Sequence, residues 1–228
     1  NPNAHTYPER TPSHLCVNVL SPEAVCAERE GEERKTPWEW GIFLPEDAQL
    51  TIIGELGSDG IAKFYKVRNG HGVFVMKIAK EPAEDINRLL HREYEKHVYL
   101  EQAALTRPQL AKYMIKAYNP AGSGQKESLP VTEDGKKYFL MECVKGQSLD
   151  RILENIQTGK EEPLGVKEIT DISRRLFEYL REIHSSGWSH RNIKPENIIV
   201  SRTGDGFVGV KITDFTAMLT NVFKIQHP

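Results

Sequence analysis

Cysteine is scarce in this chain of 228 residues, and the three that occur exclude two classes of protein. Cys16, Cys26 and Cys143 are too few and too scattered along the chain for a disulfide framework or a zinc site. Cys16 and Cys26 remain able to pair with each other. The low count nevertheless favours a reducing compartment, and we expect a cytoplasmic location.

Long apolar runs and an excess of positive charge are missing as well. No hydrophobic stretch approaches the roughly 18 residues that a membrane span needs, and the polar start NPNAHTYPER does not read as a signal peptide. The formal net charge is −2, whereas a nucleic-acid surface would show as a basic balance. We therefore expect neither a membrane span nor a nucleic-acid partner, and nothing in the sequence indicates the oligomeric state.

The first 45 residues predict an extension rather than a folded domain. Long elements are interrupted by Pro2, Pro8, Pro12 and Pro22, and the run EREGEERK is a charged cluster typical of a solvated surface. The aromatic segment that follows, PWEWGIFLP, contains Trp38, Trp40 and Phe43. Because these side chains bury much apolar area, we expect the segment to dock on the main body. A regulatory or substrate-docking role for the extension is the alternative.

Three strand-like segments follow, LTIIGELG, AKFYKV and GVFVMKIA. Turn residues at 57–60 and 69–72 separate them, so the pattern predicts an antiparallel meander. The helix over 83–105 is indicated by an apolar stripe of approximate helical period, made by Ile86, Leu89, Leu90, Tyr94, Val98 and Leu100.

Further elements complete an α+β pattern. A turn and strand are expected over 108–118 and a strand over 138–141, and Ser148 is a plausible N-cap for a short helix. The clearest helix covers 166–187, with Ile169, Ile172, Leu176, Leu180 and Ile183 on one face and Gly187 at its end.

The segment WSHRNIKPENIIVS and the KITDF that follows it carry the strongest chemical signal. The β-branched run 198–200 and the segment 208–213 predict a hairpin. Asn197 begins one strand of it and Asp214 follows the other, so both side chains are expected to converge on one point. An amide oxygen and a carboxylate that meet there suit a hard cation such as Mg²⁺.

These motifs resemble the catalytic loop and metal-binding motif of protein kinases, H-R-D-x-x-x-x-N and D-F-G. Asn192 stands where the family has its catalytic Asp, and Thr216 where it has the Gly of D-F-G. Lys77 ends a β-branched and apolar run, as does the Lys of V-A-I-K, and REYEKHVYL resembles the family's αC helix. The resemblance implies a bilobal fold in which Glu93 pairs with Lys77. Glu95, about 200° around the helix, is the other candidate partner.

The same resemblance implies an ATP site. The segment LGSDGIAKFYKV aligns with the glycine-rich loop, and Gly57, Ser58 and Gly60 are then nucleotide-binding positions. Asp59 and Ala62 replace the second and third glycines, and Phe64 replaces the valine over the adenine. Met141 corresponds to the gatekeeper, and the hinge that follows it, Glu142, Cys143 and Val144, would offer backbone contacts to adenine.

Lys194 matches a lysine characteristic of the serine/threonine branch, so the resemblance implies a protein substrate with a Ser or Thr hydroxyl. It favours this over a small-molecule phosphotransferase. His190 is expected to have a structural role, bonding the backbone around the metal motif. ATP and Mg²⁺ are the cofactors implied, with Lys77 on the phosphates and Asn197 and Asp214 on the metal.

Asn192 at the base position implies an inactive or slow kinase, because an amide cannot take the substrate proton. Two explanations stay open. An isosteric Asp→Asn change that leaves Lys77, Glu93 and Lys194 in place is typical of a designed edit. The altered glycine loop and Thr216, whose Cβ restricts the backbone, instead favour a natural pseudokinase that acts as a nucleotide-binding scaffold or allosteric regulator.

The resemblance covers residues 50–215 and ends before the activation segment and later helices of the family. The expected organisation is an extension over 1–45, an N-lobe over 46–141, and a hinge with a shortened C-lobe over 142–228. A C-terminally shortened kinase and a naturally compact one both fit. Some bacterial effector kinases are compact in this way, and such a protein would work in the host cytoplasm.

Overall fold

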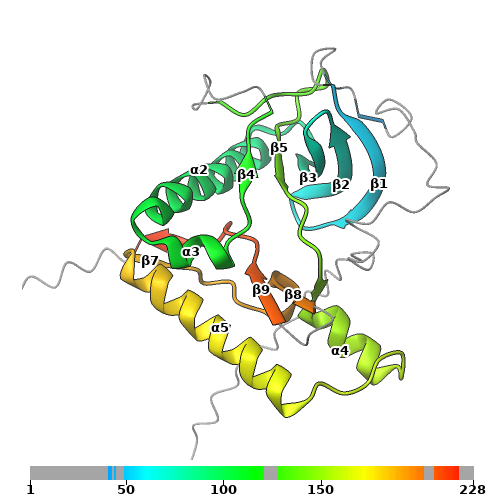
Figure 1. Ribbon diagram of the computed structural model, residues 1–228. Coiled ribbons are helices and arrows are strands. Elements are labelled where there is room, and N and C mark those ends of the chain that lie inside the picture. Colours follow the sequence, from blue (N-terminus) through cyan, green and yellow to red (C-terminus); the bar gives the residue numbers. More distant parts are fainter. Residues whose placement is uncertain (1–40, 43, 45–48, 121–127, 203–207, 221–228) are drawn as a thin grey trace, which may run out of the picture.

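The computed structural model describes residues 41–42, 44, 49–120, 128–202 and 208–220 (Figure 1). The strands of its upper part are β1 (Thr51–Ser58), β2 (Ala62–Asn69), β3 (Gly72–Ala79), β4 (Ala117–Tyr118) and β5 (Tyr138–Glu142). The helices are α2 (Glu84–Thr106), α3 (Pro108–Tyr113), α4 (Leu149–Gln157), α5 (Val166–Ser185) and the 3-10 helix η3 (Pro195–Asn197). The shorter strands of the lower part are β6 (Gln147–Ser148), β7 (Trp188–Ser189), β8 (Ile198–Arg202), β9 (Val208–Ile212) and β10 (Leu219–Thr220).

The upper part is a five-stranded sheet of order β1-β2-β3-β5-β4, and its first three strands form the predicted antiparallel meander. The register sets Lys77 of β3 opposite Phe64 of β2 on one side and Phe139 of β5 on the other. Because neighbouring strands fix their residues in register, the position of Lys77 is determined by two flanking strands.

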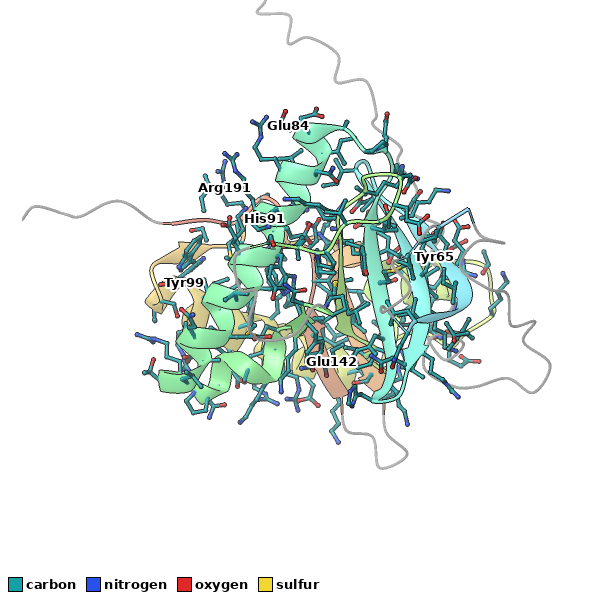
Figure 2. All side chains as sticks on the ribbon, turned by 90° about the horizontal axis from the view of Figure 1, so that it is seen from above. Tyr65, Glu84, His91, Tyr99, Glu142 and Arg191 are labelled. Carbon is teal, nitrogen blue, oxygen red and sulfur yellow. The ribbon has the colours of Figure 1, made fainter. Side chains whose placement is uncertain are left out.

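Helix α2 lies beside this sheet, one residue offset from the predicted 83–105. Figure 2, seen from above, shows Glu84 at the first turn of α2 and Tyr65 across on the strands. Leu90 and Leu100 are buried as the stripe predicted, whereas Leu89 is 38% exposed. The buried face instead includes two polar side chains, Glu93 and His97, which an apolar stripe cannot reveal.

The expectation of a turn and strand over 108–118 is wrong for most of that segment. Residues Pro108–Tyr113 form helix α3, and only Ala117–Tyr118 pair as strand β4. The physical reason lies in Pro108, which occupies the first turn of a helix, where its missing N–H costs no hydrogen bond. Leu110 and Tyr113 then bury their side chains on the helix below.

The lower part is mainly helical, with a small sheet of order β6-β8-β9 (Figure 1). Helix α5 supplies Ile172 and Ile183 to the core there, but Ile169 is 50% exposed, so the predicted stripe is buried only in part. Gly187, two residues past the helix, has φ of 79°, the left-handed conformation expected after a helix end.

Gly146 lies in the connector before β6, and any other residue there would push the connector away from the backbone of β8. Its φ is 146°, and a Cβ at this residue would lie 2.6 Å from the carbonyl oxygen of Val200. Only glycine therefore lets the connector approach β8 closely enough to pair.

Of the N-terminal expectations, few fall within the described residues. Ile42 is 5% exposed and packs with the core of the upper sheet, whereas Trp38, Trp40, Phe43 and the turn at 203–206 lie outside that part. Among the described helices, none is long and apolar enough to cross a membrane. The division at residues 45 and 141 stays a prediction.

Candidate active site

The hairpin of β8 and β9 brings Asn197 and Asp214 together as the sequence predicted. Ile198 pairs with Ile212, and the Thr213 N–H donates to the Asn197 carbonyl at 3.0 Å. The Asn197 side-chain Nδ2 lies 3.4 Å from Asp214 Oδ2. Both residues sit where a strand begins or ends, so the ladder itself fixes their separation.

His190 holds the loop that leads into this hairpin. The imidazole is 1% exposed, its Nε2 lies 3.2 Å from the Thr213 carbonyl oxygen, and its Nδ1 accepts from the Asn192 N–H at 3.3 Å. One neutral tautomer, protonated at Nε2, satisfies both contacts. Burial lowers the pKa of His190, which favours that neutral form. The structural role predicted for His190 matches this geometry.

Two non-glycine residues of the site have left-handed backbone, Arg191 with φ of 65° and Asp214 with φ of 60°. Such conformations cost of order 1 kcal/mol and persist only where surrounding contacts impose them. Contacts with the hairpin and the loop hold Asp214 in this conformation, whereas Arg191 is exposed.

Asn192 points at Asp214. Its Nδ2 donates to Asp214 Oδ2 at 2.6 Å, and its backbone carbonyl accepts from Asn197 Nδ2 at 2.9 Å. Asn192 at the base position, the Asn197 amide and the Asp214 carboxylate thus form one hydrogen-bonded triangle. An aspartate at residue 192 would set a second carboxylate against Asp214.

Lys77 and Glu93 form a buried ion pair between β3 and α2. The Lys77 Nζ donates to Glu93 Oε1 at 2.9 Å and Oε2 at 2.7 Å, and the two side chains are 2% and 1% exposed. Glu95 instead lies 3.6 Å from His91 on the outer side of the helix. The choice of Glu93 over Glu95 made from the sequence is the one the structure contains.

The charges of the site are set by their neighbours. Burial alone would lower the pKa of Lys77, but the carboxylates of Glu93, Asp59 and Asp214 raise it above its ordinary value. Burial alone would raise the pKa of Asp214, but Lys77 and hydrogen bonds from Thr216 hold it below its ordinary value. Lys77 therefore stays cationic and Asp214 anionic at neutral pH.

Thr216 joins the metal motif to α2, a link that the sequence did not reveal. Its hydroxyl donates to Glu93 Oε2 at 2.9 Å, and its backbone N–H donates to Asp214 Oδ1 at 3.1 Å. Its carbonyl accepts from Lys96 Nζ at 2.5 Å. A glycine at this position would lack the hydroxyl contact, so the departure from D-F-G adds a bond between the two halves of the site.

Replacing Thr216 with Val should lower the free energy of unfolding by about 1–2 kcal/mol, because it removes a hydrogen bond to a buried carboxylate without changing side-chain volume much. Urea denaturation measures the difference. Thr216→Ser is the matched control, since it keeps the hydroxyl, and should remain close to the parent. Equal losses for Val and Ser would contradict a role for the hydroxyl.

A cavity of about 200 Å³ lies between the sheet and the hairpin and contains most of these groups. Lys77, Glu93, Asn197, Asp214 and Lys194 line it. So do Met141, Glu142 and Val144 of the segment that follows β5. Leu56, Phe64, Val75, Ile115 and Ile199 supply its apolar walls.

The predicted residues are not all part of the cavity wall. Gly57, Ser58, Gly60 and Cys143 are absent from the described lining, and Asn192 reaches the site through Asp214. Of this loop, Asp59 lines the cavity where its neighbours were expected to do so, and it lies 3.2 Å from Lys77. The sequence flagged Asp59 as a departure, but only the fold shows that its carboxylate turns inward.

Cys143, one of the predicted hinge residues, is disulfide-bonded. The pairing of Cys16 with Cys26 that the sequence allows lies outside the described residues.

The fold and the site together define a bilobal, protein-kinase-like molecule: an antiparallel sheet with a packed helix, a mainly helical second part, and between them a cavity with apolar walls that also contains charged side chains. The family model for the protein kinase domain matches residues 50–220, and the chain belongs to that family. This covers the sheet, the ion pair, the catalytic-loop segment and the metal motif.

Individual relatives agree. The MAP kinase kinase MKK1/SSP32 of Saccharomyces cerevisiae is 26% identical over 179 residues, which are 78% of this chain and 31% of that protein. Serine/threonine-protein kinase 10 of Xenopus tropicalis is 28% identical over 177 residues, 77% of this chain and 16% of that protein. The chain therefore spans less than a third of the length of either relative.

A solved structure has the same fold. The crystal structure of the PF14_0431 kinase domain superposes with a TM-score of 0.59 over 88% of this chain and 57% of that chain. The two sequences are 14% identical, so this likeness establishes the fold alone.

Proposed function

We propose that this chain binds Mg-ATP in the cavity between the sheet and the β8–β9 hairpin, as part of a Ser/Thr protein kinase that transfers the γ-phosphate to a protein hydroxyl. One observation carries the proposal. The buried Lys77–Glu93 ion pair and the Asn197–Asp214 pair line the same cavity. Phosphoryl transfer depends mostly on positioning and charge neutralisation, and these groups supply both.

Each residue has a separable role. Lys77 would contact the α- and β-phosphate oxygens, with Glu93 fixing its ammonium. Met141 and the backbone of residues 142–144 would border the adenine. Lys194 is exposed at the edge of the cavity, where it can reach a phosphate that is being transferred to substrate. The match of Lys194 to the serine/threonine branch supports a hydroxyl substrate on protein.

The donor set at the hairpin fits Mg²⁺. Asp214 is anionic, Asn197 contributes an amide, and no group of three or more His, Cys, Asp or Glu side chains suited to a metal occurs among the described residues. Mg²⁺ suits such a sparse site, because it is commonly held by one or two protein oxygens together with substrate phosphates and waters. When bound, the ion supplies positive charge that offsets the β- and γ-phosphates.

The balance of charge in the cavity also supports a requirement for a divalent cation. Six acidic side chains and two basic ones line it. The acidic ones are Asp59, Glu93, Glu142, Asp150, Glu196 and Asp214, and the basic ones are Lys77 and Lys194. A polyphosphate brought into such surroundings needs added cations to offset its own charge.

A second function is favoured by the contact of Asn192 with Asp214. The amide donates to the carboxylate that would hold the metal and cannot accept a proton from a substrate hydroxyl. A pseudokinase that binds nucleotide and acts as a scaffold or allosteric regulator is consistent with this geometry. Both functions share the nucleotide site and differ in the rate of transfer.

Binding is tested by thermal unfolding with Mg-ATP. At about one hundred times the dissociation constant, a ligand that binds only the folded state adds about 2.7 kcal/mol, which raises the midpoint of a domain of this size by roughly 5 °C or more. A titration without any rise in midpoint, at nucleotide concentrations up to several millimolar, would remove the proposal.

The matched control is the double variant Lys77→Met, Glu93→Gln. It removes both charges of the buried pair at once, so that neither partner is left buried without the other. We expect this variant to respond to adenosine as the parent does and to lose most of its response to Mg-ATP. Retention of the full Mg-ATP response would show that the pair does not contact phosphate.

A further inference from the structure

The turn between β1 and β2 carries an aspartate whose side chain is built into the loop. Asp59 Oδ1 accepts from the backbone N–H groups of Ile61 at 2.9 Å and Ala62 at 2.7 Å. Its own N–H donates to the Ala62 carbonyl at 2.9 Å. These bonds fix the direction of the carboxylate, and one oxygen remains for another partner.

That second oxygen reaches the lysine of the buried ion pair. Asp59 Oδ2 lies 3.2 Å from Lys77 Nζ, which also donates to both oxygens of Glu93. An ammonium group has three N–H donors. Glu93 takes two of them, and Asp59 Oδ2 forms an ion pair with the same ammonium, so a phosphate oxygen that approaches Lys77 must compete with Asp59.

The two carboxylates differ in how readily they can leave. Glu93 is 1% exposed and is also held by the Thr216 hydroxyl, whereas Asp59 is 28% exposed and sits at the tip of a turn. A group that needs the Lys77 ammonium will therefore displace Asp59 and leave Glu93 in place.

We propose that Asp59 competes with nucleotide phosphate for Lys77 and so determines which ligands this site prefers, lowering its affinity for a nucleoside triphosphate relative to the nucleoside. The proposal rests on the proposed function, since it presumes that nucleotide enters this cavity. Asp59 acts against phosphates in two ways: it occupies the ammonium, and its negative charge stands in the part of the cavity where Lys77 and Asp214 are found.

The preference follows from the chemistry of the ligands. A nucleoside carries no phosphate, so it has no need of Lys77 and meets no repulsion from Asp59. A triphosphate must compete with Asp59 for Lys77 and is also repelled by the charge of Asp59. Mg²⁺ reduces the repulsion, so the competition should make triphosphate binding depend steeply on the concentration of the divalent cation.

Asp59→Asn tests the proposal with the least change of shape. The asparagine keeps an oxygen that can accept from the Ile61 and Ala62 N–H groups but carries no charge. Isothermal titration calorimetry with Mg-ATP should give roughly two- to fivefold tighter binding, the range expected when a partly exposed ion pair no longer opposes the ligand. Binding of adenosine should stay within about twofold in the same assay.

Glu81→Gln is the control, because it makes the same change of charge at an exposed residue that does not line the cavity. It should leave both affinities unchanged. Equal Mg-ATP affinity in Asp59→Asn and the parent would overturn the proposal, and weaker affinity would show that Asp59 supports the phosphates or their metal instead. A parallel change in adenosine affinity would also overturn it, since that would mean a reshaped loop. If every variant binds adenosine and none binds Mg-ATP, the proposed function is overturned as well.

Discussion

Replacing Asn192 with Asp should raise the rate of phosphoryl transfer from Mg-ATP by about 10²- to 10⁴-fold, the usual contribution of one general acid–base group. The amide of Asn192 cannot take a proton, and its Nδ2 is committed to Asp214 at 2.6 Å. The carboxylate of the variant would lie in the same place with the capacity to orient and deprotonate a substrate hydroxyl. Incorporation of labelled γ-phosphate into a generic basic protein, and into the chain itself, measures the gain.

The same substitution should make the site more dependent on metal. Two carboxylates within hydrogen-bond distance repel each other unless a proton or a cation lies between them. We therefore expect Asn192→Asp to unfold at lower temperature without Mg²⁺ and to regain much of the difference when Mg²⁺ and nucleotide are added. Asn192→Ser, which removes the amide without adding charge, is the control for both effects.

The outcome separates the two proposed functions. A variant that binds Mg-ATP and transfers no phosphate, over a range of metals and acceptor proteins, would contradict the enzyme and leave the scaffold. Rapid transfer by the Asp variant, with little by the parent, would show that activity requires a carboxylate rather than an amide at residue 192.

Much of the site could be predicted because several of its residues stand in or beside strands with strong local signals. The β-branched run 198–200 and the apolar run before Lys77 indicate strands β8 and β3. The hairpin then brings Asn197 and Asp214 together, and the kinase resemblance adds Lys77, which lines the same cavity. Helix geometry shows that Glu93 and Glu95 cannot both face Lys77. The kinase resemblance selects Glu93, and the structure contains that pair.

What could not be predicted are contacts that depend on the meeting of distant segments. The inward turn of Asp59 and the bond from Thr216 to Glu93 join residues far apart in the chain. Neither leaves a periodic trace, and a family pattern that has glycine at both positions gives no guidance on what a side chain there will touch. The helix at Pro108–Tyr113 was missed for another reason, because a six-residue helix has too few turns to show a period.

His97 is the other residue that the apolar pattern of α2 could not disclose, and it predicts a strong dependence of stability on pH. The imidazole is 1% exposed, with ring centroids 4.6 Å from Phe215 and 5.8 Å from Phe139. Nδ1 lies 3.1 Å from the Ile115 carbonyl oxygen, and Nε2 has no hydrogen-bond partner among the described residues. Burial lowers the pKa of His97 to about 3, and nearby Lys77 adds to this while Asp214 opposes it.

Between pH 7.5 and 4 the unfolded chain protonates this imidazole near its ordinary pKa of 6.5, whereas the folded chain keeps it neutral down to a pKa of about 3. Protons bound only by the unfolded state favour unfolding, so the free energy of unfolding should fall by about 3 kcal/mol over this range because of His97 alone. Urea denaturation of the parent and of His97→Leu, which fills the same apolar position without a titrating group, isolates the effect. The parent should lose about 3 kcal/mol more than the Leu variant on acidification, and parallel curves for the two proteins would show that His97 titrates alike in the folded and unfolded chains.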